Sequence, residues 1–200
     1  MFTIVVARYK EDIEWTKQFM NRFTKVIIYN KGIKLIEEDY NEILMENVGR
    51  EGHTYYSHIV NNYDNLDDYT IFLQGNPFDH SPNLIDNLFK YINNKELNIY
   101  FDYLSEKIVN SCLGVEHGSP ECKNLYTTFE KIFGVKPDNN NHECVFGAGA
   151  QFIVSKKSIL KRTKDFYENI VNILNKEICP WEGYDVERLH KYIFTDISTV

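Results

Sequence analysis

Residues 69–80 have the sequence YTIFLQGNPFDH, in which a run of β-branched and aromatic side chains is followed directly by Gly75-Asn76-Pro77. A short apolar run that ends at glycine and proline is typical of a buried strand, here Tyr69–Gln74. Continuous apolar strands of this kind are usual in parallel sheets that are covered on both faces. Similar runs occur at Thr3–Ala7 (TIVVA), Lys25–Tyr29 (KVIIY) and Gln151–Ser155 (QFIVS), and Asn98–Tyr103 is a weaker candidate strand.

Amphipathic segments alternate with these runs and predict helices. Ser81-Pro82 and Ser119-Pro120 each offer an N-cap followed by proline at the first helical position, and Gly134 offers a C-terminal stop. Apolar residues also recur at helical spacing in Glu11–Arg22, Glu51–Tyr63, Ser158–Leu174 and Asp185–Phe194. Strands that alternate with helices predict an α/β fold with a central, mostly parallel sheet flanked by helices. We expect one domain, residues 1–200, with a surface loop at residues 135–143.

The charge balance excludes some classes of partner. The formal net charge is −7, because the chain contains 22 Lys and Arg and 29 Asp and Glu. Proteins that bind nucleic acid through its phosphate backbone usually carry a basic surface, so we expect no nucleic-acid partner. No apolar stretch is long enough for a membrane span, and the first residues lack the features of a signal peptide. We therefore expect a cytoplasmic protein.

The four cysteines contain no C-x-x-C pair, and in a cytoplasmic protein we expect free thiols. A zinc site is the alternative, but its spacings fit no standard pattern of zinc ligands. That site would use Cys112, His117, Cys122, His142 and Cys144, whereas Cys179 lies apart from it.

Polar residues follow each of the first three strong strands, at Arg8–Asp12, Asn30–Gly32 and Gln74–His80. Ligands of open α/β sheets bind at the carboxyl ends of the strands. If the sheet is parallel, the three segments meet in one crevice. The alternative for any single segment is that loops are polar because they meet water.

Asp79 and His80 are neighbouring oxygen and nitrogen ligands that could hold a divalent metal such as Mn²⁺. The alternative is that Asp79 or Ser81 caps the following helix while His80 lies on the surface. Asp67-Asp68 precedes its strand and is interpreted as a turn at the opposite edge of the sheet.

Residues 47–54 (NVGREGHT) lie where a loop enters a predicted helix, and helix N-termini attract anions. Arg50 could bind a phosphate there, or it could form an ordinary surface ion pair. His53 and His58 could equally be residues of the helix face. The segment is not a P-loop, because no G-x-x-x-x-G-K-[ST] motif is present.

Two further segments carry glycines or aromatic residues. Phe146–Gln151 (FGAGAQ) precedes its strand, so it is not a dinucleotide fingerprint, and its small residues allow a ligand or another backbone to approach closely. Pro180–Arg188 (PWEGYDVER) places aromatic residues beside carboxylates, which suits a sugar. The alternative is that Trp181 packs in the core and Asp185 caps the last helix.

The strings VVARYKED, NVGREGHTYYSHIVNNYDNL, YTIFLQGNPFDH, FGAGAQFIVSKKSI and ERLHKYIF resemble, in this order, an uncharacterised family of α/β domains from fungi, bacteria and large DNA viruses. That family looks like a branch of the GT-A glycosyltransferases. It is similar in layout to the N-terminal glycosyltransferase domain of a multidomain chlorovirus protein. The resemblance covers nearly the whole chain and implies a GT-A-like fold with a nucleotide-binding, Rossmann-like half. It also implies a cytoplasmic protein, located in the cytoplasm of the host if the protein is viral.

The resemblance also implies an activity, the transfer of a hexose from a nucleotide-sugar donor, with UDP as the expected nucleotide, to a hydroxyl of a glycan or another acceptor. GT-A enzymes hold Mn²⁺ or Mg²⁺ with a D-x-D-type motif after a central strand. Here that position is Asn76–His80, where Asp79 is the acidic residue, His80 its partner, and an intact D-x-D is absent. By the same resemblance, the donor contacts are expected at Arg8, Tyr9, Asn30, Lys31, Arg50, Gln74 and Gly75.

In an inverting transferase, a carboxylate takes the proton of the acceptor hydroxyl. The candidates are Asp185, Glu182 and Glu187, in that order, because they follow the last strand. Two other functions stay open. One is a non-catalytic module of the same fold that binds a carbohydrate or nucleotide, and the other is a metal-dependent hydrolase centred on Asp79, His80 and His190. Donor sugar, acceptor, stereochemistry and oligomeric state do not follow from the residues.

Overall fold

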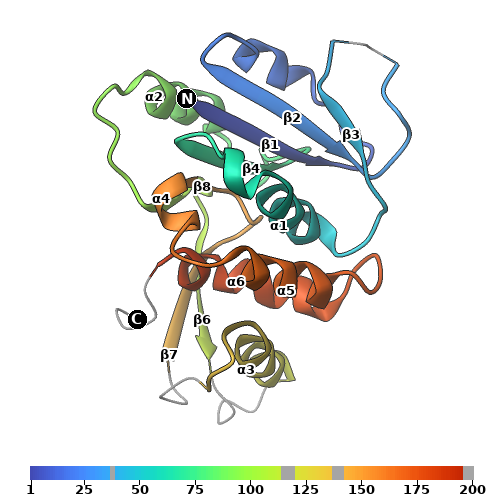
Figure 1. The fold of residues 1–200 in the computed structure, drawn as a ribbon, viewed down its shortest axis with the longest axis vertical. Coiled ribbons are helices and arrows are strands. Elements are labelled where there is room, and N and C mark those ends of the chain that lie inside the picture. The colour runs from blue at the N-terminus through green and yellow to red at the C-terminus, as the bar shows by residue number, and fades with distance from the viewer. Residues whose placement is uncertain (37–38, 114–119, 137–141, 196–200) are drawn as a thin grey trace.

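The computed structural model of the chain describes residues 1–36, 39–113, 120–136 and 142–195. Its centre is a six-stranded sheet with the strand order β3-β2-β1-β4-β8-β5 (Figure 1). Helices cover both faces of this sheet, so the described chain has the layered α/β architecture that the sequence predicts. The strands are β1 (Phe2–Arg8), β2 (Thr24–Asn30), β3 (Glu42–Leu44), β4 (Tyr69–Gln74), β8 (Phe152–Ser155) and β5 (Phe101–Tyr103).

Four of the six strands are parallel. β1 pairs in parallel with both β2 and β4, and β2 pairs in parallel with β3. The order β3-β2-β1-β4 is the one found in Rossmann-like halves, in which the chain moves outward from β1 to β3 and then returns to the other side of β1. The direction of the crossovers therefore reverses between β1 and β4. In open α/β sheets, this switch point is where ligands bind.

The other two strands depart from a simple parallel sheet. β8 pairs antiparallel with β4 and also antiparallel with β5. With its other four strands parallel, the sheet is mostly parallel, as predicted. A separate two-stranded antiparallel sheet joins β6 (Ile108–Leu113) to β7 (His142–Gly147). The sequence analysis missed β3, β6 and β7, because short strands with mixed polarity lack the continuous apolar run of the central ones.

Two helices agree closely with the sequence analysis. α1 (Arg50–Asn62) lies within one residue of its predicted limits. α3 (Pro120–Phe133) begins at the expected proline and ends before Gly134, whose φ of +69° fits a glycine C-cap.

Four helix predictions need correction. The segment from Glu11 forms only a short 3-10 helix, η1 (Glu14–Phe19). α2 (Leu84–Asn93) starts after Ser81, whose hydroxyl donates to the carbonyl of Leu104 and caps nothing. The predicted helix from Ser158 divides into α4 (Lys156–Ile159) and α5 (Lys164–Leu174), because Thr163 caps a new start. α6 (Trp181–Phe194) begins four residues earlier than predicted, directly after Pro180.

The apolar core has two layers because side chains alternate across each strand. Val5 and Phe72 face α1, α5 and α6, and Ile4 and Ile71 face η1 and α2. His58 and His190 lie in the first layer, where they accept or donate hydrogen bonds with Tyr29 Oη at 3.0 Å and Tyr56 Oη at 2.8 Å. Both histidines are therefore core residues, and His58 lies on the face of α1 that packs in the core.

The cysteine predictions are tested only in part. The thiol of Cys144 is buried and donates to the carbonyl of Arg188, and that of Cys179 is exposed; neither is in a disulfide. The side chains of Cys112, His117, Cys122 and His142, and residues 137–141 of the predicted loop, lie outside the described part of the structure. Among the described helices, none combines the length and the apolar character needed to cross a membrane.

Candidate functional site

A pocket of about 640 Å³ opens at the switch point, where β1 and β4 end. The end of β1 contributes Arg8 and Tyr9, the end of β4 contributes Gln74 and Gly75, and the start of α1 contributes Arg50. The expected convergence of the strand ends in one crevice is therefore confirmed. The complete lining is Ala7, Arg8, Tyr9, Glu11, Lys31, Asn47, Arg50, Glu51, Gln74, Gly75, Asn76, Asp79, Ile178 and Cys179.

The loop after β1 is held by its own side chains. Arg8 donates from Nε to the carbonyl of Glu11 at 3.0 Å and from Nη1 to Asn30 Oδ1 at 2.9 Å. The carboxylate of Glu11 turns back and accepts from the backbone amides of Tyr9 at 2.7 Å and Lys10 at 3.0 Å. A Cβ on Gly75 would lie 2.7 Å from this carboxylate, so a side chain at this position would force Glu11 to move. The hydrogen bonds of Arg8 thus hold the loop that forms this wall of the pocket, and Arg8 itself lines the cavity.

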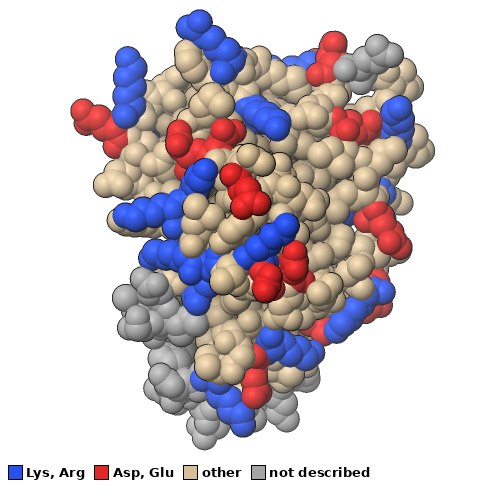
Figure 2. Space-filling model, viewed as in Figure 1, with Lys and Arg blue, Asp and Glu red and all other residues tan. Residues whose placement is uncertain are grey.

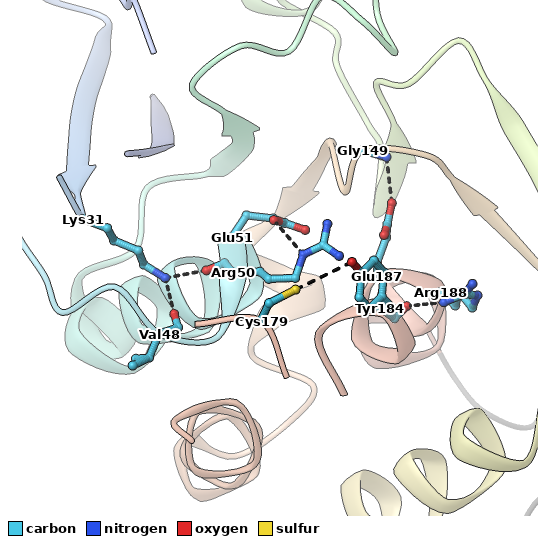
Figure 3. Close-up of polar contacts among 9 residues, drawn as sticks. All are labelled: Lys31, Val48, Arg50, Glu51, Gly149, Cys179, Tyr184, Glu187 and Arg188. Carbon is cyan, nitrogen blue, oxygen red and sulfur yellow. Dashed lines mark hydrogen bonds and ion pairs between the residues drawn. The ribbon is translucent and has the colours of Figure 1, made fainter. Parts of the chain in front are cut away.

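The last residue of β2, Asn30, and the residue after it, Lys31, support the wall of the pocket. Asn30 is completely buried and donates to Glu42 Oε1 at 2.6 Å, so it supports Arg8 and does not line the cavity. Lys31 does line it, with its ammonium donating to the carbonyls of Val48 at 2.5 Å and of Arg50 (Figure 3). Burial lowers the pKa of Lys31 to about 8, against a smaller opposing effect of Glu51. Lys31 therefore ties the end of β2 to the start of α1.

The start of α1 has an unusual backbone. Gly49 and Arg50 are both left-handed, with φ of +62° and +51°. Their amides donate to the carbonyls of Glu177 at 2.8 Å and Ile178 at 3.2 Å, so these two amides are not open to an anion, contrary to the sequence prediction. A non-glycine residue in this conformation is strained, and such residues cluster at functional sites. The Arg50 side chain remains as a group that could bind an anion here.

The Arg50 guanidinium lies among aromatic and acidic groups (Figure 3). Its central carbon lies 3.9 Å from the ring centroid of Tyr184, and its Nε lies 3.5 Å from Glu51 Oε2. Burial lowers the pKa of Arg50, but the charges of Glu51, Tyr184 and Glu187 outweigh it and raise this pKa overall. The guanidinium is therefore held as a cation at the wall of the pocket.

The segment after β4 separates the two predicted metal ligands. Asp79 is exposed and lines the pocket, but His80 does not. The His80 ring lies where a Cβ on Gly149 would be 2.6 Å from it, and its Nδ1 is buried without a partner. The predicted pair of ligands is thus not brought together at the cavity. Among the described residues, no group of three His, Cys, Asp or Glu side chains is arranged to hold a metal.

The three candidate bases of α6 have different surroundings. Asp185 is 1% exposed and accepts from Thr128 Oγ1 at 2.6 Å, so it faces α3 and not the cavity. Glu182 accepts from Lys131 and Lys176 on the same side of α6, and its pKa falls to about 2 because these bonds outweigh the effect of burial. Neither placement suits a base that must reach an acceptor, because Asp185 is enclosed and Glu182 is engaged by two lysines.

Glu187 differs from both, because it is half-buried and bonded to the backbone before β8, and it does not itself line the pocket. Its Oε1 accepts from the amide of Gly149 at 2.7 Å, and it lies near Arg50 in Figure 3. Burial, and then the charge of Glu51, raise the pKa of Glu187. A half-buried carboxylate with a raised pKa is suited to accept a proton. The surroundings of the three carboxylates therefore favour Glu187 over Asp185 and Glu182 as a base.

The site also contains residues that the sequence analysis missed. The charged residues of the lining are balanced, with Arg8, Lys31 and Arg50 against three carboxylates, of which Glu11 and Glu51 were not predicted. Ile178 and Cys179 reach the cavity from the segment between α5 and α6, and Cys179 Sγ lies 3.6 Å from Tyr184 Oη. No local pattern marks these two residues, because only the packing of α5 against α1 brings them there.

The position of His190 does not fit the predicted hydrolase centre. It is 1% exposed, its ring centroid lies 4.5 Å from that of Phe152, and its Nδ1 shares a hydrogen bond with Tyr56. Burial lowers its pKa to about 3, so it is a neutral core residue. Asp79 lines the pocket instead, and the three proposed hydrolase ligands do not form one centre.

Comparison with known proteins gives one match. No curated protein and no solved structure matches the sequence. A family model described as "Protein of unknown function (DUF3431)" matches residues 4–199. This match includes every residue of the pocket and all of the sheet except the first two residues of β1. The chain therefore belongs to the DUF3431 family.

Proposed function

We propose that the protein is a glycosyltransferase that takes a sugar from a nucleoside-diphosphate donor, with UDP as the nucleotide, and transfers it to a hydroxyl acceptor. The observation that carries the proposal is the pocket of about 640 Å³ at the switch point, whose lining includes Arg50, Lys31 and Asp79. Its position is where Rossmann-like halves bind nucleotides, and its volume is in the range of small-molecule sites. The antiparallel β8 and β5, which extend the parallel half, are compatible with the GT-A-like layout that the sequence suggests.

The charge balance of the lining supports a donor that arrives with a cation. Three cations and three carboxylates leave no net positive charge to attract a diphosphate. Mg²⁺ is commonly bound by one or two carboxylates together with substrate phosphates and water. A single exposed carboxylate, Asp79, fits this shared mode and does not fit a site made by the protein alone. When bound, such a metal would offset the charge that develops on the leaving diphosphate.

The residues of the chain then have distinct tasks. Arg50, held by Tyr184 and Glu51, would bind the diphosphate through charge-assisted hydrogen bonds. Glu187 would accept the proton of the acceptor hydroxyl, in a site where burial already favours its protonated form. Trp181, 43% exposed and with its ring centroid 5.8 Å from that of Tyr184, offers an apolar face on which a sugar ring can stack.

Calorimetry with UDP and uridine, with and without Mn²⁺, tests the binding part of this proposal. We expect UDP to bind more tightly than uridine and Mn²⁺ to increase the difference. In Arg50→Ala the affinity for UDP should fall about 10- to 100-fold, because charge-assisted hydrogen bonds contribute about 1.5–3 kcal/mol, while the affinity for uridine should change little. Equal losses for both ligands would contradict the role of Arg50 in phosphate binding.

The second candidate is a module of the same fold that binds a nucleotide or carbohydrate without transferring it. It is favoured by the absence of an intact D-x-D motif in residues 76–80. The two candidate functions differ in catalysis, because only the transferase breaks the bond between the sugar and the nucleotide. Slow hydrolysis of UDP-glucose, UDP-galactose or UDP-N-acetylglucosamine, or transfer to an acceptor panel, supports the transferase. Tight UDP binding without either reaction supports the module.

A further inference from the structure

The edge of the sheet opposite the pocket forms a surface of its own. Phe2 lies opposite both Thr24 and Tyr69, and Tyr69 lies opposite Ser155, so the amino ends of the parallel strands and the end of β8 share this edge. The amide of Ser155 donates to the carbonyl of Tyr100 at 3.0 Å, which adds the start of β5. We call this surface the amino-end face. It consists of Arg22, Phe23, Asp68, Tyr69, Tyr100, Lys156, Lys157, Leu160 and Lys161.

The amino-end face carries two adjoining hollows. One hollow of about 530 Å³ runs from Phe23 to Tyr69, and a second of about 640 Å³ runs from Tyr69 to Leu160. Both hollows include Asp68 and Tyr69, so the surface is not interrupted between them. The two adjoining hollows together make a surface that is wide enough for contact with an extended partner.

Exposed apolar side chains and cations alternate on this face. Phe23, Tyr100 and Leu160 are 58%, 48% and 44% exposed. The Arg22 guanidinium carbon lies 4.5 Å from the ring centroid of Phe23. The ammonium groups of Lys157 and Lys161 lie 5.2 and 5.6 Å from that of Tyr100. Each exposed ring therefore has a basic group over it.

The density of positive charge is high for a chain with a net charge of −7. Residues 156–164 (KKSILKRTK) contain five Lys and Arg. Figure 2 shows blue side chains gathered on the side of the molecule where α4 lies in Figure 1. The nearby acids are engaged locally, because Asp68 accepts from the amine of Met1 and Asp67 accepts from Thr3 Oγ1. The face is thus locally basic on an acidic protein.

We propose that the amino-end face docks on membranes that contain anionic phospholipids. Lipid headgroups supply the negative charge that the lysines match, and the acyl boundary accepts the protruding Tyr100, Leu160 and Phe23. Long cationic side chains reach the phosphates while their apolar stems and the neighbouring rings stay at the boundary. A nucleic acid matches the charge but offers no apolar layer for Leu160. In this orientation the pocket, at the opposite edge of the sheet, opens away from the membrane.

Vesicle co-sedimentation of the full chain tests the proposal. The protein should bind vesicles of phosphatidylcholine with phosphatidylserine and not vesicles of phosphatidylcholine alone. Each cation near an anionic surface contributes about 1 kcal/mol, a factor of about five, so Lys157→Gln with Lys161→Gln should lower binding about 25-fold. The matched control is Lys34→Gln with Lys136→Gln, which makes the same charge change at exposed lysines elsewhere.

A second pair of variants tests the apolar contribution. Tyr100→Ser with Leu160→Ser should weaken vesicle binding, and the weakening should persist at high salt, because apolar burial is not screened. Ile33→Ser with Ile36→Ser is the control, since these side chains are 88% and 97% exposed away from the amino-end face. Circular dichroism confirms that each variant is folded.

Three results would overturn the proposal. The first is an absence of binding to anionic vesicles. The second is equal loss in the two lysine pairs, which would indicate a dependence on total charge only. The third is binding of single-stranded RNA, reduced by the Lys157 and Lys161 changes, in place of vesicle binding. None of these results bears on the nucleotide pocket, so the proposed function is tested separately.

Discussion

The guanidinium carbon of Arg50 lies 3.9 Å from the centre of the Tyr184 ring, although 134 residues separate the two in the chain. Arg50 starts α1 with a left-handed backbone, and Tyr184 lies in the first turn of α6. A cation over an aromatic face gains about 0.5–2 kcal/mol, depending on solvent exposure. The contact therefore fixes the position of the cation that we assign to the diphosphate.

Replacement of the Tyr184 ring should make the Arg50 side chain more mobile while its positive charge stays in the pocket. In Tyr184→Ala the affinity for UDP should fall about 2- to 30-fold, the factor that corresponds to a cation–π contact. Tyr184→Phe keeps the ring and should bind UDP almost as the natural protein does. Calorimetry measures both. If Tyr184→Phe lost as much affinity as Tyr184→Ala, the hydroxyl and its contact with Cys179 would be responsible instead of the ring.

Glu187 is the residue whose loss should affect transfer most selectively. In Glu187→Gln the rate of sugar transfer should fall about 10²- to 10⁴-fold, the usual contribution of a general base, with UDP affinity nearly unchanged. Glu182→Gln is the matched control on the same helix, because Glu182 is paired with Lys131 and Lys176. Rates come from a coupled assay for released UDP. A large loss in Glu182→Gln with none in Glu187→Gln would reverse the assignment.

Asp79 should control the effect of metal and not the binding of nucleotide itself. In Asp79→Asn we expect Mn²⁺ to lose its ability to strengthen UDP binding, because the amide no longer offers a negative oxygen ligand. Binding of UDP without metal should stay as before. Asp86→Asn removes an exposed carboxylate of α2 that does not line the pocket and serves as the control. An undiminished Mn²⁺ effect in Asp79→Asn would move the metal to other ligands.

Asp185 should make the stability of the protein depend on pH. Burial raises its pKa from the ordinary 3.8 to about 6, against the opposing effect of the hydrogen bond from Thr128. Between these values the folded state holds a proton that the unfolded state releases. The stability from this group is therefore present near pH 4 and is lost as the pH rises through 6, by up to about 3 kcal/mol.

Urea unfolding of the natural protein and of Asp185→Asn, at several pH values from 4 to 8, measures this effect. Relative to the natural protein, Asp185→Asn should have a higher free energy of unfolding at pH 8 than at pH 4. Other titrating groups, including the buried histidines, are common to both proteins and cancel in the difference. A constant difference from pH 4 to pH 8 would show that Asp185 titrates as in the unfolded chain.

Gly49 should tolerate a side chain far less well than Gly134, although both have positive φ. A Cβ on Gly49 would lie 2.6 Å from the Cβ of His53 and 2.7 Å from the carbonyl oxygen of Leu174, whereas one on Gly134 meets nothing within 4 Å. Gly134→Ala should cost about 1 kcal/mol from backbone strain alone, and Gly49→Ala several kcal/mol more. Thermal unfolding measures both, and equal losses would mean that the backbone at Gly49 can adjust.

Local sequence determined the central elements of this protein. β1, β2, β4 and α1 could be predicted almost to the residue, because continuous apolar runs and helical periodicity identify elements that are buried on a large part of their surface. The segments that follow β1, β2 and β4 could also be assigned to one crevice, because parallel strands end at the same edge of a sheet. Arg8, Lys31 and Asp79 were found for that reason, and Arg50 was found because it lies where a loop enters a predicted helix.

Only the tertiary structure decided which of the chemically suitable residues belong to the site. Asp185 and Glu187 are two positions apart on one helix, yet Asp185 is enclosed against α3 whereas Glu187 accepts from the amide of Gly149, because positions two apart on a helix point in different directions. Cys179 and Ile178 reach the pocket through the packing of α5 on α1, which no local pattern encodes. Composition and periodicity specify which segments are buried, whereas contacts between distant segments specify which side chains meet.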